Sequence, residues 1–252
     1  MQVIEGIGAL RPEHGPSFVV VGVFDGLHLG HAYLLDQLVA LAAARGARPT
    51  VITFDHHPDE VLTGKAPPLL LDAGERLERL ETAGVAVTVV QRFDEALRQT
   101  PYDDFVERIR ARVALTGFLM TPDAAFGFER RGTPAALAEL GARDDFEVVV
   151  VPTFTLDGRD VRSSSIRGCI AAGDLAGAGR LLGRPVTITG SIDHTVDGRS
   201  RLAFDLPVAL PPDGDYPVMV DAALSTLRIA CGEAYLLGEC PEGRVTVVLG
   251  DA

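Results

Sequence analysis

The sequence predicts an α/β protein with a doubly wound parallel sheet, followed by a small antiparallel β-domain. Three observations lead to this fold class. Short apolar segments alternate with amphipathic ones as far as Pro152, as they do when helices cover both faces of a parallel sheet. A glycine-rich turn at residues 22–31 joins the first two of these segments. Beyond Pro185, apolar and polar residues alternate along the chain, which favours antiparallel strands.

The predicted parallel strands are short, apolar and often β-branched, because strands inside such a sheet are buried on both faces. Their ranges are 17–23, 49–54, 85–91, 115–120 and 146–152. Helices are predicted between them, where apolar residues recur with helical spacing. These ranges are 32–45, 74–83, 102–112 and 134–141. Thr100 and Pro101 supply a capping residue and a first-turn proline for the third helix.

Ligands of doubly wound sheets bind beyond the carboxyl ends of the strands. Several polar side chains follow directly after predicted strands, so we expect them to share this edge of the sheet. They are His28, His31, Asp55, His57 and Asp123.

The pattern changes at Leu156. Asp157-Gly158 predicts a turn, and two short helices follow, one leading on from residues 161–167 and one at 175–182. The predicted antiparallel strands are 186–189, 202–206, 216–220, 224–230 and 245–249, which form a barrel or a sandwich. We therefore predict two domains, residues 1–185 and 186–252.

The composition excludes several classes of function. The formal net charge is −12 and no basic patch is present, so we expect no nucleic-acid partner. No apolar run is long enough to span a bilayer and no signal peptide is visible, which predicts a cytoplasmic protein without a membrane partner. The three cysteines (Cys169, Cys231 and Cys240) form no CxxC pattern and predict neither disulfides nor a metal site. The sequence makes no prediction of oligomeric state.

Residues 22–31 read Gly-Val-Phe-Asp-Gly-Leu-His-Leu-Gly-His and are expected to form a tight turn at a helix start, with His31 in a solvent-facing position. Such a turn suits a polyphosphate, because free N–H groups and the helix dipole both face the anion. Gly30 leaves room for phosphate beside the backbone. His28 and His31 can donate hydrogen bonds and are cations when protonated. The alternative is a glycine-rich turn with two surface histidines.

This run resembles the HxGH motif of nucleotidyltransferases. In its longer form, GxFDGxHxGH, it resembles the FMN adenylyltransferase module of bacterial bifunctional riboflavin kinase/FAD synthetases, whose fold is Rossmann-like. Four further segments resemble motifs of that family in the same order. They are Thr53–Leu62 (TFxxHPxxVL), Pro122–Gly127 with Gly132 (GxDFxFG), Val161–Arg167 (ISSTxIR) and Gly173–Pro185 (GD…LLGRP).

The resemblance implies roles for individual residues. Catalytic residues would be His28, His31 and Arg167. ATP would be bound by Gly22, Phe24, Gly30, His31, Ser163, Ser164 and Arg167. The flavin would be bound by His57, Pro58, Asp123 and Phe126. The flavin loop departs from the family pattern, since Thr121-Pro122 replaces the usual glycine and Ala124 replaces phenylalanine.

Several of these residues also have structural interpretations. The serines can simply cap a helix. Phe126 can be a core aromatic residue. His57, held extended by Pro58, can make a structural hydrogen bond in its loop. Asp25, followed by Gly26, can support the turn.

The implied reaction is adenylyl transfer from ATP to FMN, giving FAD and pyrophosphate. The FMN phosphate is already an anion, so in-line attack on the α-phosphorus needs no strong base. The protein would align the substrates and stabilise charge, with Mg²⁺ neutralising the polyphosphate. Two alternatives remain open: transfer to a modified flavin phosphate or other phosphomonoester, and a non-catalytic flavin- or nucleotide-binding protein.

The C-terminal residues resemble a shortened riboflavin kinase barrel. Residues 186–192 resemble its first strand, and residues 210–216 resemble the LPxDGxY turn. Residues 202–206 (Leu-Ala-Phe-Asp-Leu) stand where the family carries GFPTAN, whose Thr and Asn hold ATP and magnesium. The NIGxxPTF segment and the catalytic glutamate have no counterpart, and the 67 residues after Pro185 are fewer than a full kinase module needs. We therefore expect no kinase activity.

Overall fold

The computed structural model describes residues 1–194, 199–221, 223–238 and 243–249. The chain forms two compact units. The first unit comprises Met1–Phe24, Gly30–Pro67 and Leu77–Phe154, and the second comprises Asp25–Leu29, Pro68–Arg76 and Thr155–Ala252. Cys240 lies outside the described residues. Among the helices that are described, none is both long and apolar enough to cross a bilayer.

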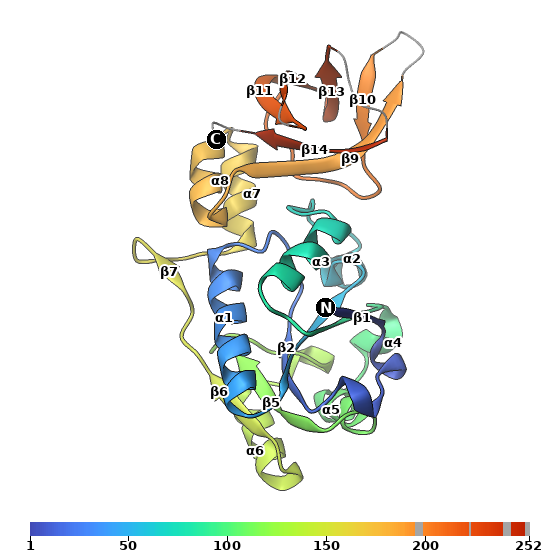
Figure 1. Ribbon diagram of the computed structural model, residues 1–252, viewed down its shortest axis with the longest axis vertical. Helices are drawn as coiled ribbons and strands as arrows, with labels where there is room; N and C mark the ends of the chain where they lie inside the picture. Colours follow the sequence, from blue (N-terminus) through green and yellow to red (C-terminus); the bar gives the residue numbers. More distant parts are fainter. Residues whose placement is uncertain (195–198, 222, 239–242, 250–252) are drawn as a thin grey trace. The chain divides into compact units, whose positions relative to one another are not determined.

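The first unit contains a parallel sheet, of which Figure 1 labels β1, β2, β5 and β6. The sheet has six strands in the order β1-β4-β3-β2-β5-β6. Its strands are β1 Gln2–Glu5, β2 Ser17–Val21, β3 Arg48–Phe54, β4 Val87–Gln91, β5 Leu115–Met120 and β6 Glu147–Val150. The predicted doubly wound sheet is therefore confirmed. The edge strand β1 was not predicted, because only two of its four residues are apolar and none of them is fully buried.

Helices cover both faces of this sheet. They are α1 Leu29–Ala44, α2 Pro58–Thr63, α3 Ala73–Thr82, α4 Glu95–Arg98, α5 Tyr102–Arg110 and α6 Pro134–Asp144, with 3₁₀ turns η1 Ile7–Ala9, η2 Pro12–His14 and η3 Phe128–Arg130. Val19, Ile52 and Phe118 pack with residues of α5 and α6 in one apolar cluster. Phe18 points to the opposite face, where the guanidinium of Arg45 lies over its ring.

The strand order reverses beside β2. From β2 the chain adds β3 and then β4 on one side, and β5 and β6 follow on the other side. Ligands of doubly wound sheets usually bind at the carboxyl ends of the strands beside such a reversal, which here is the end of β2.

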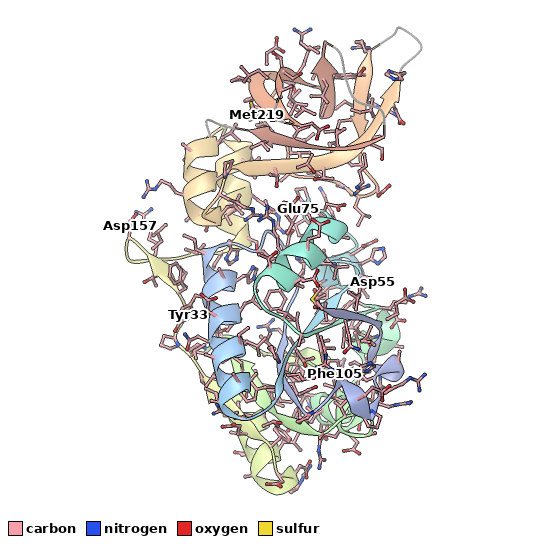
Figure 2. All side chains as sticks on the ribbon, viewed as in Figure 1. Tyr33, Asp55, Glu75, Phe105, Asp157 and Met219 are labelled. Carbon is pink, nitrogen blue, oxygen red and sulfur yellow. The ribbon has the colours of Figure 1, made fainter. Side chains whose placement is uncertain are left out.

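The second unit contains a hairpin, two helices and a closed barrel. The hairpin is β7 Thr155–Leu156 and β8 Arg159–Asp160, with Asp157 at its tip (Figure 2), and the helices are α7 Ser163–Ala171 and α8 Leu175–Leu182. The barrel order is β10-β13-β12-β11-β14-β9. Its strands are β9 Val186–His194, β10 Ser200–Ala203, β11 Gly214–Val220, β12 Ala223–Ala230, β13 Glu233–Leu237 and β14 Arg244–Leu249. Of the two predicted arrangements, the barrel is the correct one.

An apolar cluster of described residues holds the second unit together. Ile166, Ile170 and Leu182 from α7 and α8 pack in it with the inward-facing residues of the barrel. Leu70 belongs to the same cluster, and its neighbour Leu69 exchanges backbone hydrogen bonds with residues 207 and 209. The compact units thus follow packing, whereas the predicted boundary after residue 185 follows motifs and stays a prediction.

Candidate functional site

Two hydrogen bonds join β3 to the start of the loop after β2. The N–H of Gly22 donates to the carbonyl of Ile52 (3.0 Å), and the Thr53 hydroxyl donates to the carbonyl of Val23 (3.0 Å). Phe24 has a φ of 54°, a left-handed value that non-glycine residues rarely adopt. Its buried side chain and this unusual conformation indicate that the loop geometry is held by its surroundings.

His31 lies in the first turn of α1, because this helix begins at Leu29 and not at the predicted residue 32. Its ring centroid is 5.1 Å from that of Phe24, and the side chain is partly buried. The expectation of a solvent-facing turn is therefore wrong for His31. Gly30 is the second residue of the helix, so both residues stand at its N-terminal end.

His28 directly precedes α1 and is only 5% exposed, so it is not a surface histidine. Burial, and then the positive charge of Arg184, lower the pKa of His28 from 6.5 to about 4. His28 is therefore neutral near pH 7, and it becomes a cation only at lower pH. A neutral imidazole there can still donate one hydrogen bond and accept another.

Arg184 is a residue that the sequence analysis did not assign. One nitrogen, Nη2, donates to the carbonyl of Gly26 (2.7 Å), and Nη1 approaches the carbonyl of Leu27 (3.4 Å). Arg184 thus fixes the backbone on the N-terminal side of His28. Arg184 belongs to the LLGRP run, but a sequence motif does not show which residues lie next to it in the folded protein.

Asp25 and Arg167 form a partly buried ion pair, 142 positions apart in the chain. Arg167 Nη2 lies 2.5 Å from Asp25 Oδ2, and Asp25 Oδ1 accepts the N–H of Leu70 (2.9 Å). The Ser163 hydroxyl donates to the carbonyl of Asp25 (2.9 Å). Asp25 therefore supports the turn, as its structural interpretation predicted.

The serines Ser163, Ser164 and Ser165 are the first three residues of α7. The N-cap is Arg162, and it makes no side-chain capping bond. The capping interpretation of the serines is therefore wrong. The N-terminal end of α7 lies beside the Asp25 turn, because the Ser163 hydroxyl contacts it directly.

His57 is the N-cap of α2, which the sequence analysis did not predict. Its Nδ1 accepts the N–H of Asp59 (3.2 Å), and Pro58 is the first residue of the helix. His57 itself is extended, as Pro58 requires. The structural hydrogen bond expected for His57 is confirmed, and a flavin contact remains a prediction.

The loop after β5 carries the other predicted flavin residues. The Phe126 ring is 5.1 Å from that of Phe105, which Figure 2 labels, and 5.7 Å from that of Phe118, so this partly buried side chain packs against the core. Asp123 is exposed, and one of its oxygens accepts the Thr121 hydroxyl (2.9 Å). The exposed carboxylate of Asp123 has no role in packing, whereas the ring of Phe126 does.

The predicted site residues divide between the two units. The first unit holds Gly22, Phe24, Gly30, His31, His57, Pro58, Asp123 and Phe126, and the second unit holds His28, Ser163, Ser164 and Arg167. Asp55 follows β3 (Figure 2) and accepts the N–H groups of His56 and Phe93, which ties its loop to the one after β4. Within the described ranges, no three His, Cys, Asp or Glu side chains are grouped as metal ligands.

A doubly wound sheet whose central strand leads into an HxGH turn, together with a six-stranded barrel, defines a nucleotidyltransferase-type α/β protein. The family model of FAD synthetase matches residues 10–165, and the chain belongs to this family.

Bifunctional riboflavin kinase/FMN adenylyltransferases are among the relatives of this chain. The protein from Pseudomonas fluorescens is 33% identical over 195 residues, covering 77% of this chain and 63% of the relative. The one from Haemophilus influenzae is 34% identical over 197 residues, covering 77% and 64%. The chain thus spans less than two thirds of the length of these curated relatives.

A crystal structure described as a macrolide-efflux protein from Streptococcus pneumoniae has a similar fold. The TM-score is 0.78 at 23% sequence identity, with 98% of this chain and 88% of that chain covered. At this identity the likeness supports the fold alone.

Proposed function

We propose that the chain transfers the adenylyl group of ATP to FMN, forming FAD and pyrophosphate. One observation carries this proposal: three separate family motifs meet within the second unit. The Asp25–His28 turn is joined by hydrogen bonds to Ser163 and Arg167 of α7 and to Arg184 beyond α8. The three segments are distant from one another in the sequence, and each resembles a motif of the FAD synthetase family.

The chemistry needs alignment more than proton transfer. An oxygen of the FMN phosphate attacks the α-phosphorus of ATP, and the bond from that phosphorus to the bridging oxygen of the β-phosphate breaks. Pyrophosphate leaves with the bonding electrons. We assign His28, as a neutral hydrogen-bond donor, and His31 to the α-phosphate. Ser163, Ser164 and Arg167 are assigned to the leaving pyrophosphate, and Gly22, Phe24 and Gly30 to the ATP-binding backbone.

Mg²⁺ is proposed to enter as part of the MgATP substrate. The described residues offer no three-ligand cluster, and the Asp25 carboxylate is already engaged by Arg167 and Leu70. Mg²⁺ commonly keeps several waters and binds through substrate phosphates, so this arrangement suits it. It would neutralise part of the polyphosphate charge.

For the flavin, we propose contacts from His57, Pro58, Asp123 and Phe126. Asp123 is exposed, and Phe126 lies in the same loop, partly buried. The proposed acceptor is FMN, although Ala124 in this loop packs against the core where the family carries a larger aromatic residue. That difference favours a modified flavin phosphate as the second candidate acceptor.

We propose that the barrel lacks riboflavin kinase activity, because residues 202–206 carry neither the Thr nor the Asn expected for ATP and magnesium. We also propose a cytoplasmic location, where ATP is available. Neither the barrel nor the charge of the chain supports a nucleic-acid partner in this proposal.

The test is a chromatographic assay of the purified protein with ATP, Mg²⁺ and FMN, beside a second mixture with riboflavin in place of FMN. We expect FAD and pyrophosphate from the first mixture and no FMN from the second. FMN formed from riboflavin would contradict the proposal for the barrel. If the first mixture yields nothing, a panel of flavin phosphates and phosphomonoesters separates a different acceptor from a non-catalytic binding protein.

A further inference from the structure

The guanidinium of Arg167 is held along one edge. Its Nε donates to the carbonyl of Pro68 (2.8 Å), and its Nη2 donates to the Asp25 carboxylate (2.5 Å). These two nitrogens form the side edge of the planar group. Arg167 makes its contacts with the described residues through this edge. The other end of the guanidinium, which carries Nη1 and the second hydrogen of Nη2, is called the free end below.

Asp25 is itself rigidly placed. Its side chain is 4% exposed, compared with 16% for that of Arg167. Its second carboxylate oxygen accepts the N–H of Leu70, and its carbonyl accepts the hydroxyl of Ser163. Leu70 in turn is buried in the apolar cluster of the second unit. The carboxylate therefore has a fixed position from which to orient Arg167.

An arginine held in this way differs from one that is free to move. An unrestrained side chain loses rotamer entropy when it binds a phosphate, whereas an arginine fixed at one edge presents its remaining donors without that loss. Bidentate binding of phosphate also depends on the plane of the guanidinium. Fixing that plane is a way to place two donors on a polyphosphate.

We propose that Asp25 is a positioning residue, which holds the side edge of Arg167 so that the free end of its guanidinium binds the polyphosphate. This inference rests on the proposed function for the identity of the nucleotide substrate. Asp25 itself touches neither substrate in this arrangement. Its effect on binding passes through Arg167.

The first test is Asp25→Asn, which keeps an acceptor for Leu70 but removes the negative charge beside Arg167. We expect kcat/KM for ATP to fall by about 100-fold, while KM for FMN stays within about 2-fold. Pyrophosphate affinity, measured by calorimetry, should fall by about 10-fold. Asp157→Asn is the matched control, because it removes a similar but exposed pair with Arg180 (2.6 Å) and should change none of these values.

A double-mutant cycle separates positioning from general stability. If Asp25 acts through Arg167, the Asp25→Asn/Arg167→Gln variant should bind pyrophosphate no more than about 2-fold more weakly than Arg167→Gln alone. Losses that multiply would overturn the proposal, as would an Asp25→Asn variant with normal ATP and pyrophosphate parameters. A parallel loss of FMN affinity would indicate a merely structural role.

A second variant keeps the test decisive if Asp25→Asn does not fold. Arg167→Lys keeps the positive charge and leaves Asp25 in place, but it lacks the planar group that the two acceptors hold. It should weaken pyrophosphate binding about as much as Arg167→Gln, and wild-type affinity in this variant would overturn the proposal. Pyrophosphate binding needs no turnover, so it tests the role of Asp25 even if the wild-type protein makes no FAD. A wild-type protein that makes no FAD would instead reject the proposed function.

Discussion

At the scale of single residues, the two histidines of the motif have different environments. His28 is enclosed beside Arg184, whereas His31 lies on the first turn of α1 against the ring of Phe24. The sequence does not distinguish them, because both are histidines of the same short motif. Their burial depends on residues distant in the chain, and these differ for each histidine.

The environment of His28 leads to a prediction for its titration. Its pKa is about 4 in the folded protein and 6.5 in the unfolded chain, so the unfolded state binds more protons between these values. Stability should therefore fall as the pH drops from about 6.5 towards 4, by about 2 kcal/mol between pH 7 and pH 5. NMR titration should show this pKa directly, with the resonance identified by its absence in His28→Gln.

In urea denaturation, His28→Gln should lose about 2 kcal/mol less stability than the wild type between pH 7 and pH 5. A His28 resonance that titrates near pH 6.5 would contradict this account of its burial.

His31→Ala should lower kcat for FAD synthesis by about 100-fold or more, because the proposed donor to the α-phosphate is lost. The variant also loses its contact with Phe24, which costs about 1 kcal/mol of stability and leaves the fold intact. Steady-state kinetics and a thermal melt measure the two effects. His194→Ala, an exposed histidine at the end of β9, is the control and should change neither. Retained activity in His31→Ala would count against the phosphate site.

At the scale of elements, the apolar pattern predicted the bounds of some strands and helices correctly. The range predicted for β5 is the observed one, and helix α8 also has its predicted range. β13 was not predicted, because Cys231-Gly232 does not resemble the usual hairpin turns, although both residues have the positive φ that such a turn requires. A strand as short as β13 contains too few alternations of apolar and polar residues to be recognised from the sequence.

Two helix glycines give an element-scale prediction with opposite signs. In α6, a Cβ on Gly141 would overlap the carbonyl oxygen of Phe146, so Gly141→Ala should destabilise the protein by about 1–3 kcal/mol. In α7, a Cβ on Gly168 would meet nothing within 4 Å, so Gly168→Ala should stabilise by about 0.5–1 kcal/mol. Urea denaturation of the pair measures this, and equal effects would refute the packing argument.

At the scale of the whole molecule, the sequence could not predict how its motifs meet. Periodicity reports local structure, but the pair of Asp25 and Arg167 joins residues 142 positions apart. The resemblance to a family supplied the candidate residues, and it did not show that Arg167 is held by Asp25 or that Arg184 fixes the turn before His28. These contacts depend on tertiary packing.

The packing of the second unit predicts the outcome of removing the barrel. Leu70, Ile166, Ile170 and Leu182 share one apolar cluster with the barrel strands, and Leu69 bonds to residues 207 and 209. A chain ending at Pro185 would expose these side chains, each worth about 1.5–3 kcal/mol, against a typical stability of about 5–15 kcal/mol. We therefore expect the shortened chain to bind an apolar dye, to melt without a cooperative transition of its helices α7 and α8, and to lose FAD synthesis.

The full-length variant Leu224→Ser is the control for this experiment, because Leu224 is 84% exposed on the barrel and its loss should change stability by less than about 0.5 kcal/mol. The motif boundary after residue 185 predicts the opposite result for the shortened chain, namely cooperative melting and full activity. Thermal melting, dye fluorescence and the FAD assay decide between the two. If the packing account is correct, the barrel keeps Arg167 and the Asp25 turn in place even without a kinase activity of its own, because the helix that carries Arg167 depends on the barrel for its buried face.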